Sequence, residues 1–95
     1  MPVSPDIIAK IQHDFSKGEV APAIDLVSNL STEDRDTFTD QVLRCVIFLS
    51  NGSLTDLVRN LACARTDWRD VIYWAEYDAN DVRVRDHNVP FRSNV

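Results

Sequence analysis

The sequence has little of what marks a disordered, membrane-spanning or disulfide-linked chain. Its 95 residues include only two glycines, four prolines and two cysteines. So few chain-breaking residues argue against a loop-rich or disordered chain. The longest uninterrupted apolar run covers residues 45–49, far short of the roughly 18 residues that a membrane-spanning helix needs. We therefore expect one soluble globular domain that has no membrane as a partner.

Positive charge is also scarce. Lys10 and Lys17 are the only lysines, and the formal net charge is −5. Nucleic acids and anionic membrane surfaces are bound through clustered lysine and arginine side chains, so neither is expected as a partner. The N-terminal residues lack the basic leader and the continuous apolar stretch of a secretory signal. The cytoplasm is therefore the default location.

Sequence motifs with a fixed catalytic spacing are missing. There is no glycine-rich phosphate loop, GxSxG, HExxH or paired CxxC. His13 and His87 have no partner at a spacing that identifies a catalytic triad. Cys45 and Cys63 fall inside helical apolar patterns, which favours buried, reduced thiols over a disulfide or a zinc site. The sequence therefore predicts no cofactor and no metal, and it favours a non-enzymatic protein.

Helix-start patterns, in contrast, are frequent. Ser4 followed by Pro5 places a capping hydroxyl before a residue whose φ is already helical. Ser31, Ser53 and Thr66 can cap further helices in the same way. Together with apolar residues at spacings of three and four, these patterns predict five short helices. The expected helices cover about 5–16, a short stretch that has Pro22 in its first turn, 32–50, 54–65 and 67–77.

The predicted fold class is all-α. Between residues 42 and 49 only Arg44 interrupts the apolar residues, and a helix that is apolar nearly all round is usually buried, so the third helix is expected at the centre. After the last helix, "VRVRD" alternates apolar and basic residues, which predicts extended chain. We expect a compact helical bundle over 1–78, with an extended C-terminal tail over 79–95 that packs on the last helix within the same domain.

The stretch "DWRDVIYWAEYD", residues 67–78, holds both tryptophans and both tyrosines of the chain. At 100° per residue, its helix has two apolar arcs on opposite sides. The first arc is expected to lie in the core and consists of Trp68, Val71, Ile72 and Ala75. The second arc consists of Asp70, Tyr73, Trp74 and Tyr77.

Two interpretations of the second arc are open. The tail can fold back over it, with an arginine stacked on one of the rings; the covering residues would be Val82, Val84, Val89, Pro90 and Phe91. Alternatively the arc stays open and contacts another protein or a second copy of the chain, since aromatic side chains with polar tips are enriched at interfaces. The candidate protein-binding residues are Asp70, Tyr73, Trp74, Tyr77, Arg83 and Arg85.

The function predicted from these features is that of a protein-interaction module or accessory subunit. The alternative is a small enzyme or ligand-binding protein with a pocket between the last helix and the tail. That pocket would be lined by Trp74, Tyr77, Arg83 and His87.

Overall fold

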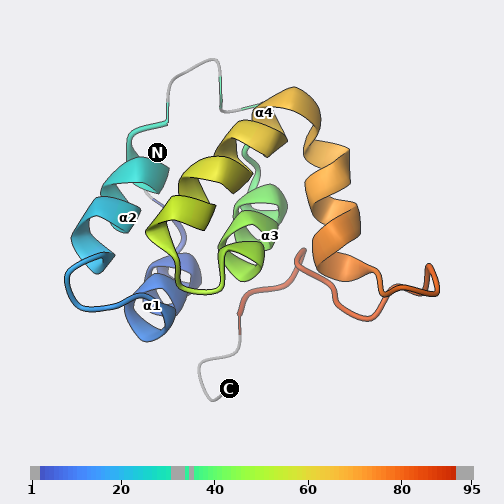
Figure 1. The fold of residues 1–95 in the computed structure, drawn as a ribbon, viewed down its shortest axis with the longest axis horizontal. Helices are drawn as coiled ribbons and strands as arrows, with labels where there is room; N and C mark the ends of the chain where they lie inside the picture. The colour runs from blue at the N-terminus through green and yellow to red at the C-terminus, as the bar shows by residue number, and fades with distance from the viewer. Residues whose placement is uncertain (1–2, 31–33, 35, 92–95) are drawn as a thin grey trace.

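The computed structural model describes residues 3–30, 34 and 36–91. This part of the chain is all-helical, as predicted, and has no β-strand; Tyr77 and Arg83 form an isolated antiparallel bridge. Four helices are described where five were expected. They are α1 (Pro5–Asp14), α2 (Val20–Ser28), α3 (Asp40–Ser50) and α4 (Leu54–Glu76). In Figure 1, α1 and α2 lie on one side of α3, α4 first crosses in front of α3, and the part of α4 after its bend lies on the other side of α3.

Helices α1 and α2 pack against each other through small and branched apolar side chains. Ile7 and Ile11 of α1 and Ala23 and Val27 of α2 are all buried, because their spacing places them on one face of each helix. Helix α1 ends at Asp14, two residues before the expected end, because the backbone of Phe15 is extended at φ −87° and ψ 149°. The ring of Phe15, directly after α1, is buried in the core.

The first helix cap differs from the prediction. Ser4 occupies the position before α1, but its side chain does not cap the helix. The Ser4 hydroxyl instead donates a hydrogen bond to Asp40 Oδ2 at 2.9 Å. This bond joins the start of α1 to the start of α3, so the residue ties two helices together.

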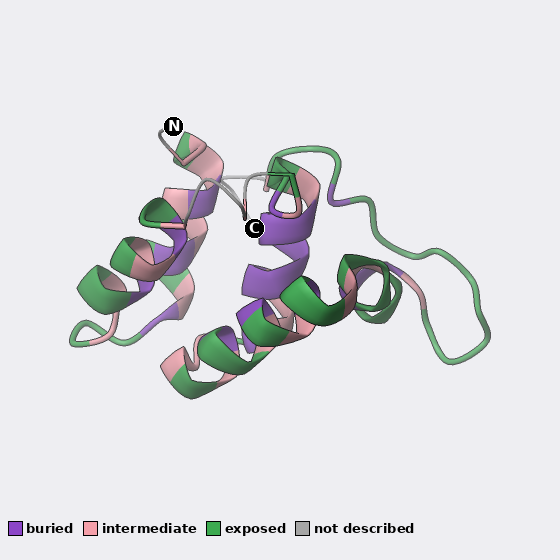
Figure 2. Ribbon diagram, turned by 90° about the horizontal axis from the view of Figure 1, so that it is seen from above, coloured by how far each residue is buried: buried purple, intermediate pink, exposed green. Residues whose placement is uncertain are grey.

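Helix α3 is the central helix, as predicted, but it begins later than expected. It starts at Asp40, and Thr39 Oγ1 caps it by accepting the N–H of Val42 at 3.3 Å. Residues 36–39 are not helical, so the expected start at residue 32 is wrong; the predicted cap Ser31 lies outside the described residues. Every residue from 42 to 47 is buried, and Figure 2 shows this helix as the most continuously buried element.

Helix α4 joins the two helices expected over 54–65 and 67–77. Ser53 caps its start, as predicted, by accepting the N–H of Asp56 at 3.2 Å. At Asp67 the backbone leaves the helical region, with φ −157° and ψ 100°, and the helix bends. The Thr66 hydroxyl donates to the carbonyl of Ala62, whereas Asp67 accepts the N–H of Arg69 at 3.1 Å. The position of the break was predicted correctly, but Asp67 rather than Thr66 caps the second limb.

The turn between α3 and α4 packs against the end of α1. Asn51 and Gly52 both have positive φ, 50° and 79°. A Cβ atom on Gly52 would lie only 2.3 Å from the carbonyl oxygen of Asp14. Glycine is therefore required here both for the backbone conformation and for the close approach.

The segment after α4 leaves the bundle and then returns to it. Residues 78–86 are exposed, and Figure 2 shows them as a loop that extends away from α4 before the chain reaches α3. His87 is buried there. The N–H of Phe91 then donates to Asp6 Oδ2 of α1 at 3.1 Å. This segment therefore connects the end of α4 to both α3 and α1.

Candidate functional site

The inner arc of the second limb of α4 is only partly as predicted. Val71 and Ala75 are fully buried, and Ile72 packs at the edge of the core. Trp68 is exposed, so its assignment to the core is wrong. Trp68 is the first residue after the bend at Asp67. Trp68 lies at the start of the second limb, so a position on the inner arc is not enough to bury its side chain there.

The outer arc stays open to solvent. Tyr73 and Trp74 expose 45% and 51% of their surface, whereas Tyr77 is half-buried. Trp68, from the predicted inner arc, exposes 44%. The rings of Tyr73 and Tyr77 stack with their centroids 5.3 Å apart. The Tyr73 hydroxyl also donates to a carboxylate oxygen of Asp81. We refer to Trp68, Tyr73, Trp74 and Tyr77 as the aromatic face.

Over residues 79–91, the part of the tail that the structure describes, the chain does not cover the aromatic face. Val82, Val84 and Val89, expected to lie over the rings, are themselves exposed. Phe91 packs against the core and against the ring of His87, whose centroid is 5.8 Å away. The covering interpretation is therefore wrong for Tyr73 and Trp74, because the tail is drawn toward α3 and α1 instead.

A shallow groove lies beside Trp74 at the bend of α4. Its volume is about 300 Å³, and its lining is predominantly apolar. We refer to it as the kink groove. The lining residues are Arg59, Ala62, Cys63, Thr66, Asp67, Asp70 and Trp74. Of the predicted binding residues, the structure brings Asp70 and Trp74 together here, one helical turn apart.

The two tail arginines are held by the protein itself. Arg83 donates to Glu76 Oε1 at 2.9 Å and to Asp86 Oδ1 at 2.9 Å. The guanidinium of Arg85 lies over the ring of Phe48, 4.6 Å from its centroid. Neither residue lines the kink groove, so their contacts attach the tail to α3 and α4.

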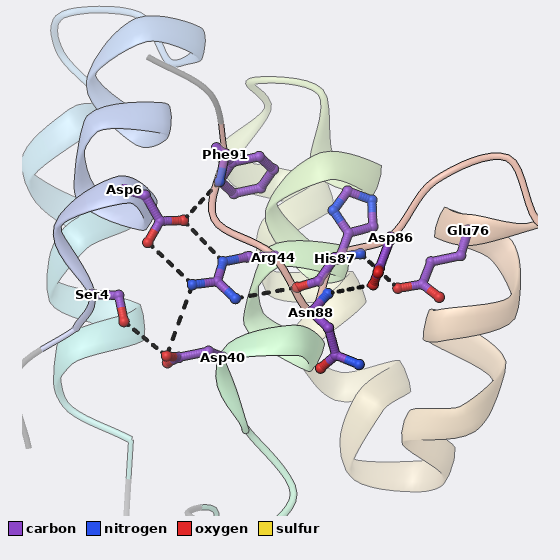
Figure 3. A network of polar contacts seen from close by, with 9 residues as sticks. All are labelled: Ser4, Asp6, Asp40, Arg44, Glu76, Asp86, His87, Asn88 and Phe91. Atoms are coloured by element: carbon purple, nitrogen blue, oxygen red, sulfur yellow. Dashed lines mark hydrogen bonds and ion pairs between the residues drawn. The ribbon is translucent and has the colours of Figure 1, made fainter.

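A polar network inside the bundle was not predicted from the sequence (Figure 3). Arg44, 95% buried in α3, donates to both carboxylate oxygens of Asp6, at 2.9 and 3.2 Å. It also donates to the backbone carbonyl of His87 at 3.2 Å. Burial raises the pKa of Asp6, but the hydrogen bonds from Arg44 and from the N–H of Phe91 outweigh it, so this pKa lies below 3.8. The network joins α1, α3 and the tail.

Glu76, at the end of α4, is a further charged group in this network and is only 1% exposed. Its oxygens accept hydrogen bonds from three donors, one on α3 and two on the tail. These are Gln41 Nε2 of α3 at 3.1 Å, Arg83 Nε at 3.0 Å and the N–H of His87 at 2.8 Å. A buried carboxylate needs such partners to compensate for lost hydration. Glu76 is therefore part of the framework that holds the tail.

The imidazole of His87 lies between two aromatic rings. Its centroid is 5.2 Å from that of Phe48 and 5.8 Å from that of Phe91. Among the described residues, nothing hydrogen-bonds to its buried Nε2 atom. Burial lowers the pKa of His87 below 6.5, and Arg85 adds to this against the opposing charges of Glu76 and Asp86. The neutral ring is therefore favoured in the folded protein.

The residues expected to line a ligand pocket lie in different environments. Trp74 faces the kink groove, Arg83 faces Glu76, and His87 is buried beside Phe48. Tyr77 stacks on Tyr73. Within the described residues, no group of three or more histidine, cysteine, aspartate or glutamate side chains is placed to hold a metal ion.

The two cysteines are free thiols in different environments. Cys45 is fully buried, and burial raises the pKa of its thiol to about 12. Cys63 is half-buried and lines the kink groove. Only Cys45 lies fully inside the core, whereas the expectation was that both thiols are buried.

Comparisons with protein-family models, with curated proteins and with solved structures each gave no match. In the described part of the chain, no helix has the length and apolar character that crossing a membrane requires. What the chain does must therefore be inferred from its own residues.

Proposed function

We propose that this chain is a non-enzymatic protein-interaction module or accessory subunit that binds its partner through the aromatic face and the kink groove. One observation carries the proposal. Three large aromatic side chains on one limb of α4 remain about half exposed, although the same limb buries Val71 and Ala75 completely. Large aromatic side chains left exposed on one short limb of a small domain are typical of a contact surface.

The chemistry of these side chains supports protein binding. Tryptophan and tyrosine combine a large apolar surface with one polar atom, and they dominate the binding energy of many interfaces. Within the described residues, neither indole N–H of Trp68 or Trp74 has a hydrogen-bond partner. A partner can therefore bury both rings and also accept these two N–H groups.

The aromatic face also rests on a fixed support. The inner side of the limb is anchored in the core by Val71 and Ala75. The ring of Tyr73 is held by Tyr77 and by Asp81. A surface already fixed in position loses little conformational entropy on binding, which favours affinity.

The proposal is tested by comparing the intact chain with two single substitutions in affinity capture from its native cells. Trp74→Ala removes the most exposed ring of the aromatic face. Val58→Ala removes an equally exposed apolar side chain from the first limb of the same helix. We expect a partner that the intact chain and Val58→Ala retain and that Trp74→Ala loses, because a central aromatic residue at an interface contributes about 2 kcal/mol or more.

Circular dichroism and urea unfolding of both variants provide the folding control, and both should match the intact chain because the two side chains lie outside the core. Sedimentation of the purified protein tests self-association through the same face. The proposal fails if the intact chain captures nothing and remains monomeric, or if Trp74→Ala binds the same partner as tightly as Val58→Ala does.

A further inference from the structure

The kink groove has room for one or two side chains of a partner. Its volume of about 300 Å³ lies at the lower limit of pockets that enclose whole small molecules, roughly 300–1,000 Å³. Ala62 and Cys63 contribute apolar surface on the first limb, and the indole of Trp74 lies on the second limb. A long side chain with an apolar stem fits this shape.

The charge around the groove is negative. Asp70 lies one turn before Trp74 on the same face, and within the described residues no side chain pairs with its carboxylate. Asp78 and Asp81 follow on the exposed loop. The nearby cations are already engaged: Arg83 pairs with Glu76, and Arg69 pairs with Asp67 at 3.2 Å. Among the described residues, the Asp70 carboxylate therefore stands beside Trp74 without an ion pair.

Arg59 is the one cation among the residues that line the groove. It precedes Cys63 by one turn on the first limb, and it pairs with Asp56 at 3.2 Å. The free carboxylate and the indole therefore lie together on the second limb.

We infer that the kink groove receives an arginine side chain from a basic segment of the partner protein. A planar guanidinium stacks on an indole and donates two parallel hydrogen bonds to a carboxylate, so Trp74 and Asp70 match its two modes of recognition. The methylene stem of the arginine lies along Ala62 and Cys63. This inference rests on the proposed function and specifies the chemistry of the partner.

A second copy of the chain is a poor occupant of the groove. The chain carries a net charge of −5, and two copies that meet at this acidic surface would place like charges together. A basic partner instead gains from the same field during encounter, and this gain decreases with added salt. The negative charge of the chain therefore favours a basic partner over self-association.

Cys63 provides a built-in probe of the groove. It is half-buried in the groove lining, whereas Cys45 is fully buried with a thiol pKa of about 12. The thiolate is the reactive form, so an alkylating reagent should modify Cys63 and spare Cys45 in the folded protein. The rate of this reaction reports whether the groove is occupied.

The experiment uses a short capped peptide in which arginine alternates with leucine, and a matched peptide in which glutamine replaces each arginine. We expect the arginine peptide to slow the alkylation of Cys63 and the glutamine peptide to have little effect.

Asp70→Asn should weaken binding about two- to fivefold, as expected for an exposed ion pair. Trp74→Ala should weaken it roughly tenfold. Asp25→Asn removes an equal charge from the exposed side of α2 and should leave binding unchanged.

Three results would overturn the inference. Equal weakening by Asp25→Asn and Asp70→Asn would mean that only the net charge of the chain matters. Equal protection by the two peptides would mean that the groove does not select arginine. Protection that increases with protein concentration in the absence of peptide would assign the groove to a second copy. In each case, loss of the captured partner in Trp74→Ala would still support the proposed function, so the two failures are distinguishable.

Discussion

At the scale of single residues, charged side chains inside the bundle decide how the tail is attached. Arg44 and Glu76 are 5% and 1% exposed, and each is paired with an opposite charge. A lone arginine in an apolar run indicates that a carboxylate lies opposite it. The sequence could not show which of fifteen acidic residues that is, because Asp6 is 38 residues away from Arg44 along the chain.

Removing one member of the buried pair should destabilise the fold. In Asp6→Ala, the guanidinium of Arg44 stays buried without its carboxylate, and we expect the free energy of unfolding to fall by about 3 kcal/mol. Asp25→Ala, on the exposed side of α2, should change it by less than about 0.5 kcal/mol. Urea unfolding measures both. Equal effects of the two substitutions would show that the buried pair has no special role in stability.

His87 should make stability depend on pH. Burial holds the pKa of His87 in the folded protein below 6.5, so the unfolded chain takes up the proton first as the pH falls. Stability is therefore complete above pH 6.5 and decreases below it. Asp6 affects stability at lower pH. Its pKa in the folded protein lies below 3.8. Its contribution to stability is therefore present above pH 3.8 and is lost as the pH falls through the folded pKa.

The substitution His87→Phe separates these two effects. It keeps an aromatic ring between Phe48 and Phe91 but removes the titrating group. Urea unfolding on either side of pH 6.5 should then show no loss of stability from this residue, while the loss below pH 3.8 remains. If the decrease just below pH 6.5 persists in this variant, another group causes it.

At the scale of helices, local sequence patterns predicted which segments are helical better than where they begin. The cap at Ser53 and the break near Thr66 could be read directly, because both depend on neighbouring residues. The start of α3 could not, since Ser31 and Thr39 are both chemically suited to cap a helix. Trp68 was misplaced for a related reason: the bend at Asp67 changes the direction of α4, and periodicity alone does not show it.

The turn between α3 and α4 gives a prediction about glycine. Gly52→Ala places a Cβ atom 2.3 Å from the carbonyl oxygen of Asp14 at a positive φ, so stability should fall by about 1–3 kcal/mol. Gly18→Ala is the matched control, because no atom lies within 4 Å of its Cβ position; its effect should be nil or a gain of up to about 1 kcal/mol. Thermal unfolding compares them, and an equally mild effect at Gly52 would contradict the close packing of this turn.

At the scale of the whole molecule, the tail and the aromatic face have separate roles. The residues from His87 to Phe91 tie α4 to α3 and α1 through contacts with Glu76, Arg44 and Asp6. This attachment draws the tail away from Tyr73 and Trp74, which remain exposed. The sequence identified the outer arc as the open question, but the path of the tail depends on these long-range polar contacts and could not be read from local patterns.

The most direct test of the binding face is acrylamide quenching of tryptophan fluorescence, with and without the captured partner. Trp68 and Trp74 are the only tryptophans of the chain, and both belong to the aromatic face. When the partner has no tryptophan, or has its tryptophans replaced, all tryptophan fluorescence of the complex comes from this face. We predict efficient quenching in the isolated chain, because both rings are about half exposed, and strong shielding in the complex. Shielded tryptophans in the isolated chain, or quenching that the partner leaves unchanged, would contradict a binding role for this face.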